Sequence, residues 1–270
     1  METRFINIRE KNFMVEIGGK YDSLWRMMED GVWEPETLDI MERYLSDGGR
    51  FVDIGAWVGP TSLFAASLGS EVEAFEPHPE NIKNLKRNIK VASFIKSIKV
   101  HEYGLWKTTG KQMLYATVGK TSGASIIPSR FSKFPVSIKL RNLDEITELN
   151  KDNLSLIKMD IEGAEYELLY YLLNKLNKAN PPVLLSLHPH KVDRNKPLVI
   201  RQIMAFYRVG QLYRAFRKYK VYRVDKNEDR TGAKLKPWSF SDYFVSCFSS
   251  LFRKIKSFSL PNMVLITKKK

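Results

Sequence analysis

Three side chains that could move a proton or bind a metal ion follow two apolar stretches in the second half of the chain. Asp160 and Glu162 end LSLIKMDIEG, and His188 lies near the end of PPVLLSLHPH. A neutral imidazole is well matched to general-base catalysis near pH 7, so His188 is the candidate base, and Asp160 would orient it or the substrate. The same three side chains could instead hold a divalent ion that acidifies a bound hydroxyl. The structural alternatives are Glu162 at a helix N-terminus and His188 in a turn.

A turn containing glycine earlier in the chain could hold a small ligand. The stretch FVDIGAWVGP, residues 51–60, contains the candidate ligand-binding residues Asp53, Gly55, Ala56 and Gly59. A dinucleotide-binding turn needs G-x-G-x-x-G, but Trp57 and Pro60 occupy the second and third glycine positions. A phosphate-binding loop is excluded as well, because no G-K-[ST] follows. The turn therefore predicts a ligand without phosphates.

An acid at the end of the next predicted strand indicates that this ligand contains a nucleoside. Glu76 ends EVEAFEP and could accept hydrogen bonds from both ribose hydroxyls. Asp53 could accept from an ammonium group, and Gly55 would allow a methionine portion to approach the backbone. Together these residues predict S-adenosylmethionine (SAM) as the cofactor. The structural alternative is a strand-to-helix turn in which Asp53 caps the helix.

Strand and helix patterns alternate from residue 50 onward and must position these side chains. Seven predicted strands lie in RFVDIGA, EVEAFEP, IKVHEYGLW, LSLIKMDIEG, PPVLLSLHPH, KVYRVDK and NMVLITKKK. The alternation predicts an α/β fold with a doubly wound, mostly parallel seven-stranded sheet, and residues 107–140 read as a β-hairpin insertion. Ligands of such sheets bind at the carboxyl ends of the strands, where Gly104 joins the acidic strand ends as a candidate.

The charge of the chain is concentrated in its last third. The net charge is +14, and residues 191–270 contain 20 Lys and Arg against 5 Asp and Glu, which leaves 24 against 25 in residues 1–190. This asymmetry predicts docking to an anionic membrane, a nucleic acid or a charged glycan, with a merely solvated basic face as the alternative. Within it, residues 239–258 read as an aromatic and basic helix that either packs in the core or faces a membrane.

Cysteine content and hydropathy bear on the compartment. The single cysteine, Cys247, excludes a disulfide framework and a zinc cluster of thiolates. The N-terminal residues contain charges throughout, and no window reaches the roughly 18 uncharged residues of a membrane-spanning helix. We therefore expect a cytoplasmic protein that is at most peripheral to the membrane.

Several of these motifs together resemble the FkbM-type family of class I SAM-dependent methyltransferases. The resemblance rests on FVDIGAWVGPTSLFAASLG, EAFEPHPENIKNLKRNI and LIKMDIEGAEYELL, with WEPET as a similar lead-in, and it covers residues 30–190. Within these stretches, Glu34, Pro77 and Asn81 complete the predicted cofactor-binding set. Two positions depart from the family pattern, since Trp57 stands where an asparagine is usual and Ser186 where a glutamate is common.

The resemblance implies a Rossmann-like sheet whose last strand is antiparallel, and O-methylation of a hydroxyl on a saccharide, glycan or small metabolite. The implied organisation is a helical lead-in at residues 1–48 and a methyltransferase domain at 49–270, with a basic C-terminal helical elaboration at 191–270. Two other functions stay open, namely an RNA methyltransferase and a non-catalytic SAM-fold protein that docks on an anionic membrane or partner. Nucleic acid is the less favoured substrate, because DIEG is not the D/N-P-P-Y/F pattern of amino-group methylation. The oligomeric state stays open.

Overall fold

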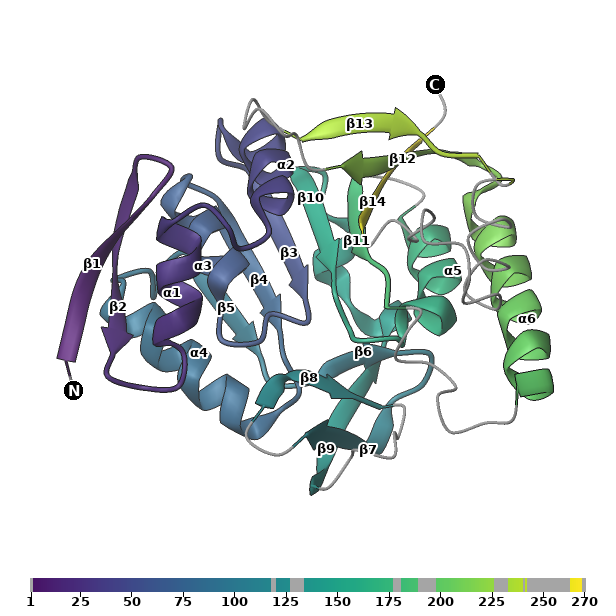
Figure 1. Ribbon diagram of the computed structural model, residues 1–270, viewed down its shortest axis with the longest axis horizontal. Helices are drawn as coiled ribbons and strands as arrows, with labels where there is room; N and C mark the ends of the chain where they lie inside the picture. Colours follow the sequence, from purple (N-terminus) through teal and green to yellow (C-terminus); the bar gives the residue numbers. More distant parts are fainter. Residues whose placement is uncertain are drawn as a thin grey trace.

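An eight-stranded mixed sheet forms the centre of the computed structural model, which describes residues 2–117, 120–126, 134–176, 181–188, 198–225, 233–239, 241 and 263–268 (Figure 1). The strand order is β13-β12-β14-β11-β10-β3-β4-β5. The strands are β3 (Arg50–Ile54), β4 (Glu71–Phe75), β5 (Ile98–His101), β10 (Leu154–Met159), β11 (Val183–Ser186), β12 (Tyr219–Asp225), β13 (Lys234–Pro237) and β14 (Met263–Lys268).

The directions of the strands confirm the predicted fold class. Strands β11, β10, β3, β4 and β5 are parallel neighbours, whereas β14 runs antiparallel between β11 and β12. These seven strands include the antiparallel last strand that the family resemblance implied. The predicted number of strands was wrong by one, because the short strand β13 adds to the edge of the sheet beside β12.

Helices cover both faces of the sheet because successive strand residues point to opposite sides. The helices are α1 (Asp22–Glu29), α2 (Pro35–Leu45), α3 (Pro60–Ser67), α4 (Pro79–Val91), α5 (Glu165–Lys175) and α6 (Leu198–Phe216). Phe51 packs in one apolar core with α1 to α4, and its neighbour Val52 packs in a second core with α5 and α6. Two consecutive strand residues thus help to hold two helical layers.

A second, four-stranded sheet lies beside the carboxyl ends of the central strands (Figure 1). It consists of β6 (Gly104–Trp106), β7 (Gly110–Thr117), β8 (Lys120–Ser125) and β9 (Phe134–Asn142) in the order β6-β9-β7-β8. The short 3₁₀ helices η1 (Leu143–Glu145) and η2 (Thr147–Asn150) follow. The predicted hairpin insertion is therefore part of a larger unit, because the predicted third strand divides after His101 and its second half joins this sheet. Leu114, Ile138 and Leu140 form a small core of its own.

The N-terminal region differs from the predicted helical lead-in. Its second part contains α1 and α2, but β1 (Glu2–Ile8) and β2 (Lys11–Ile17) form an antiparallel hairpin. The hairpin packs on the sheet-covering helices through Ile6, Ile8, Phe13 and Val15, which alternate along the two strands. The division into a lead-in and a methyltransferase domain remains a prediction.

The tail prediction falls mostly outside the described part of the chain. Of the predicted helix at residues 239–258, the structure describes residues 239 and 241 only. Across the residues that it does describe, no helix combines the length and the apolar character needed to cross a membrane.

Candidate active site

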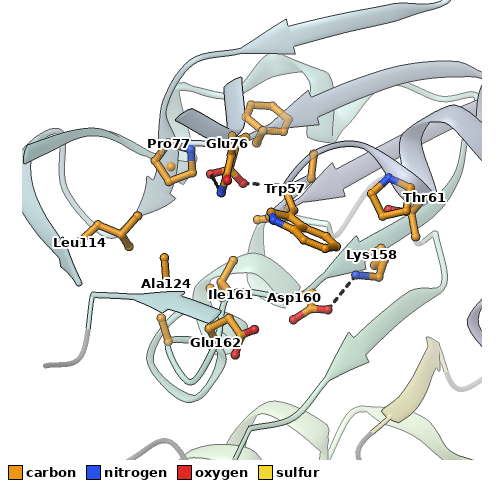
Figure 2. Close-up of a pocket in the computed structure, with 18 of the residues that line it drawn as sticks. Trp57, Thr61, Glu76, Pro77, Leu114, Ala124, Lys158, Asp160, Ile161 and Glu162 are labelled. Carbon is orange, nitrogen blue, oxygen red and sulfur yellow. Dashed lines mark hydrogen bonds and ion pairs between the residues drawn. The ribbon is translucent and has the colours of Figure 1, made fainter. Parts of the chain in front are cut away.

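A pocket of about 610 Å³ opens at the carboxyl ends of β3, β4, β10 and β11, against the four-stranded sheet. Figure 2 shows Glu76 and Pro77 across the pocket from Asp160 and Glu162, with Leu114 and Ala124 on a third side. Ten of the twelve predicted site residues line it: Glu34, Gly55, Ala56, Glu76, Pro77, Asn81, Gly104, Asp160, Glu162 and His188. The structure thus brings the predicted cofactor residues and the predicted catalytic residues into a single pocket.

Glu76 anchors the half of the pocket formed by β3 and β4. Its carboxylate accepts hydrogen bonds from the backbone N–H groups of His78 (2.8 Å) and Trp57 (2.9 Å) and from Asn81 Nδ2 (3.2 Å). Burial raises the pKa of Glu76 to about 7, helped by the negative charge of Asp53, although the three hydrogen bonds oppose the shift. The carboxylate is therefore a fixed acceptor that becomes protonated below neutral pH.

Asn81 supplies a second acceptor beside Glu76. The residue is buried, and its Oδ1 has no hydrogen-bond partner among the described residues. A buried acceptor without a partner is costly, and a ligand hydroxyl would satisfy it. Together, the Glu76 carboxylate and Asn81 Oδ1 fit the two hydroxyls of a ribose, so the residues present fit the adenosine part of SAM.

Gly55 serves the turn differently from the sequence expectation. Its φ of +91° lies in the left-handed region, and a Cβ at this position would lie 2.0 Å from the carbonyl oxygen of Asp160. The glycine therefore lets the ends of β3 and β10 approach each other, in addition to lining the pocket.

Comparing alanine substitutions at Gly55 and Gly69 distinguishes the cost of backbone strain from the cost of a steric clash at this close approach. Gly55→Ala is expected to lower the free energy of unfolding in urea by about 1–3 kcal/mol more than Gly69→Ala. Gly69 has a similar φ of +90°, but no atom lies within 4 Å of the place that its Cβ would occupy, so it reports the strain alone. Equal losses in the two variants would contradict the proposed close packing.

Asp53 and Gly59 support the pocket from outside it. Asp53 is fully buried, and its Oδ2 accepts from Thr61 Oγ1 and Ser62 Oγ, both at 2.7 Å, at the start of α3. Both partners are side-chain hydroxyls, and α3 has no side-chain cap hydrogen bond, so Asp53 does not cap the helix. Asp53 does not line the pocket either. Gly59, with φ +97°, precedes α3, and a Cβ there would lie 2.6 Å from Leu85 Cδ1.

Lys158 is a buried cation that the sequence analysis missed. Its Nζ donates to Asp160 Oδ2 at 3.0 Å, and the carboxylates of Glu34 and Asp53 interact with the same charge. Burial alone would lower the pKa of Lys158, but these three negative charges outweigh it and raise the pKa. A lysine inside the apolar run LSLIKMD was the available signal, because a buried lysine requires acidic partners.

Glu165 holds both the loop after β10 and the candidate base. It is fully buried; its Oε2 accepts from Gly163 N (2.7 Å), and its Oε1 accepts from Ile161 N (3.0 Å) and lies 3.0 Å from His188 Nδ1. A carboxylate acceptor at Nδ1 fixes the proton on that nitrogen and leaves Nε2 as the basic atom. The sequence analysis missed Glu165, whose signal was a second acid three residues after Glu162.

The Nε2 atom of His188 faces two other carboxylates at the pocket. It lies 3.7 Å from Asp160 Oδ1 and 3.5 Å from Glu162 Oε2, and Glu162 has a left-handed backbone with φ +60°. Burial alone would lower the pKa of His188, but the hydrogen bond to Glu165 and the charges of Asp160 and Glu165 raise it above its ordinary value. The three predicted catalytic side chains therefore meet around the Nε2 atom of His188.

The metal alternative involves a different carboxylate from the predicted one. Ligand atoms of Asp160, Glu165 and His188 lie within 4.8 Å of one another. Glu165, however, already accepts from two backbone N–H groups and faces the imidazole. This arrangement suits orientation of the imidazole better than coordination of an ion, and metal dependence remains a prediction.

Two further regions line the pocket, mostly with apolar side chains. The four-stranded sheet and the residue after β8 contribute Leu105, Trp106, Leu114, Ala124, Ile126, Ile138 and Leu140, and the region around α1 contributes Lys20, Tyr21, Ser23, Leu24 and Met27. The sequence analysis did not assign these residues to the site, because their proximity depends on how the insertion and the lead-in fold back over the central sheet.

Comparisons with known proteins place the chain in a family. The family model of the methyltransferase FkbM domain matches residues 52–218, which is more than half of the chain. The hexuronic acid methyltransferase AglP of Haloferax volcanii is 25% identical over 167 residues, which cover 62% of this chain and 67% of that protein.

Two solved structures are also similar. The methyltransferase FkbM of Methylobacillus flagellatus is 21% identical, with a TM-score of 0.41, and the match covers 80% of this chain and 53% of that one. The O-methyltransferase of Bacillus cereus, solved in complex with SAH, is 11% identical, with a TM-score of 0.44 and coverage of 87% and 80%. The strand order, the pocket at the strand ends and the match over residues 52–218 lead to one assignment: the chain belongs to the FkbM family of SAM-dependent methyltransferases.

Proposed function

We propose that the protein transfers a methyl group from SAM to a hydroxyl group of a sugar, with His188 as the general base. The observation that carries this proposal is that the pocket contains both the buried acceptors Glu76 and Asn81 and the Nε2 atom of His188. A pocket that holds only a cofactor would not need an oriented imidazole beside it.

The residues of the pocket have separate tasks in this reaction. When bound, SAM would supply an electrophilic methyl group for transfer to the acceptor oxygen, with its sulfur as the leaving group. Glu76 and Asn81 bind the ribose hydroxyls and fix the orientation of the cofactor. His188 Nε2 takes the proton that the acceptor hydroxyl loses, and Glu165 stabilises the imidazolium through Nδ1.

A sugar acceptor is supported by the curated relative and by the pocket wall. That relative is named for its action on a hexuronic acid. In this chain, Trp106, Asp160 and Glu162 all line the pocket, which therefore offers both an aromatic side chain and carboxylate acceptors. Aromatic faces bind the apolar faces of sugars, and carboxylates accept hydrogen bonds from their hydroxyls.

The test is formation of S-adenosylhomocysteine in the presence of SAM and candidate acceptors, with and without Mg²⁺. The panel should contain neutral hexoses, hexuronic acids and their lipid-linked forms, because the strongly basic residues 191–270 fit an anionic lipid carrier. We expect turnover with at least one sugar, and a methyl ether in the product. Binding of SAM without turnover on any sugar, but with turnover on RNA, would overturn the choice of acceptor.

A further inference from the structure

Trp57 has a backbone conformation that a bulky side chain rarely adopts. Its φ is +52°, in the left-handed region. Residues other than glycine and asparagine are strained there, and such strain concentrates at binding and catalytic sites. The position lies in the turn between β3 and α3, where its backbone N–H donates to Glu76. Trp57 is thus a strained residue in the half of the pocket formed by β3 and β4, where Glu76 lies.

The indole of Trp57 presents a buried donor without a partner. Its Nε1 has no hydrogen-bond partner among the described residues, although the ring lines the pocket. Figure 2 shows the ring between Glu76 and the pair formed by Asp160 and Lys158. An indole N–H can only donate, so only an acceptor can satisfy it, and the place of Trp57 in the pocket lining allows a ligand to supply that acceptor. The strained backbone and the unpartnered donor therefore both indicate that Trp57 binds a ligand.

The ring is held in this place by the lead-in helix region. Tyr21 packs edge-on against Trp57 with 5.6 Å between ring centroids, and the Nζ of Lys20 lies 5.0 Å from the centroid of Tyr21. Lys20 in turn pairs with Glu80 at the start of α4. Because this packing already restricts the Trp57 side chain, the side chain loses little further conformational entropy when it binds a ligand.

The charges around Trp57 indicate which acceptor it meets. Glu34, Glu76 and Asp160 line the pocket as acids. The two lysines of the lining are already paired with carboxylates, Lys158 with Asp160 and Lys20 with Glu80. The acids suit the ribose hydroxyls and the ammonium group of SAM. The carboxylate at the amino-acid end of SAM needs a donor instead, and Trp57 Nε1 is the buried, unpartnered side-chain donor in the described pocket lining.

We propose that Trp57 Nε1 donates a hydrogen bond to the carboxylate of the amino-acid portion of SAM and so selects a cofactor with an intact amino-acid end. This inference rests on the proposed use of SAM. It assigns to Trp57 the recognition of the amino-acid end, for which the sequence had suggested Asp53 and Gly55.

The test compares SAM with decarboxylated SAM, which lacks only that carboxylate, by calorimetric titration. Wild type is expected to bind SAM about 10- to 100-fold more tightly, the effect of one hydrogen bond to a charged group. Trp57→Phe keeps an aromatic ring and removes the donor, so the preference should fall to nearly one. Trp238→Phe makes the same change in a tryptophan that packs on Phe216 away from the pocket, and should keep the preference.

Three results would overturn the inference. They are equal binding of the two cofactors by wild type, an unchanged preference in Trp57→Phe, and an equal loss for both cofactors in that variant. If Trp57→Phe fails to fold, Trp57→Gly takes its place, because glycine tolerates a left-handed backbone and has no side-chain donor; it too should lower the preference. A wild-type protein that binds neither SAM nor SAH would instead refute the proposed function itself.

Discussion

A protein in which alanine replaces His188 is expected to bind SAM normally and to methylate its acceptor about 10²- to 10⁴-fold more slowly. The loss follows from the position of Nε2, which is oriented by Glu165 and faces Asp160 and Glu162. The measurement is kcat from SAH formation at saturating SAM, with the Kd of SAM from calorimetry as the check on folding. A variant that loses cofactor affinity and rate together would point to a structural role for His188.

The pH dependence provides a readout that a structural role would not produce. His188 must be neutral to accept a proton, and its pKa is raised. The rate should therefore increase with pH, with its midpoint above the ordinary histidine value of about 6.5. Glu165→Gln removes a negative charge that raises this pKa, so the midpoint should move to lower pH. A rate that does not depend on pH across the neutral range would exclude His188 as the base.

The variant Glu76→Ala is expected to lower the affinity for SAM by about 10²- to 10⁴-fold. Each hydrogen bond to a charged group contributes about 1.5–3 kcal/mol, and the proposed function places Glu76 against the ribose hydroxyls together with Asn81. The substitution also removes the acceptor that holds the backbone N–H groups of Trp57 and His78. Calorimetric titration with SAM measures the effect.

The matched control for this variant is Glu102→Ala, which removes an exposed carboxylate that pairs with Lys86 at the surface. It should leave the Kd of SAM unchanged. Because the pKa of Glu76 is about 7, the carboxylate is charged above that pH and protonated below it. Affinity for SAM in wild type should therefore weaken as the pH falls through about 7, and this dependence should disappear in Glu76→Ala.

The central sheet could be predicted because its strands are apolar runs with clear ends. The inner face of α4 was also predictable, since Ile82, Leu85 and Ile89 recur at helical spacing and are buried. The strand β13 was missed because Lys234–Pro237 is short, basic and at an edge. The N-terminal hairpin was missed because its turn lacks the usual glycine: Arg9 and Glu10 both adopt positive φ.

A site residue could be predicted where it directly follows a strand. The ion pairs of the site could not be predicted, because they join residues that are far apart in the sequence. Glu76 could be placed from its position at the end of β4. The partners of Lys158 come from segments more than a hundred residues apart, Glu34 and Asp53 on one side and Asp160 on the other. The sequence predicted Asp53 as a cofactor-binding residue, but Asp53 does not line the pocket and accepts hydrogen bonds from α3. An acid at the end of a strand can point into the pocket or toward the next helix, and the sequence does not reveal which.

The four-stranded sheet has a consequence for how this enzyme could change over evolutionary time. Its small core of Leu114, Ile138 and Leu140 is separate from the two large cores of the central sheet, yet each of these side chains also lines the pocket. Substitutions there reshape the wall without disturbing the packing around Phe51 or Val52, which hold the helices and the cofactor turn. The four-stranded sheet can therefore change to fit a new methyl-acceptor substrate while the central sheet keeps the cofactor-binding turn.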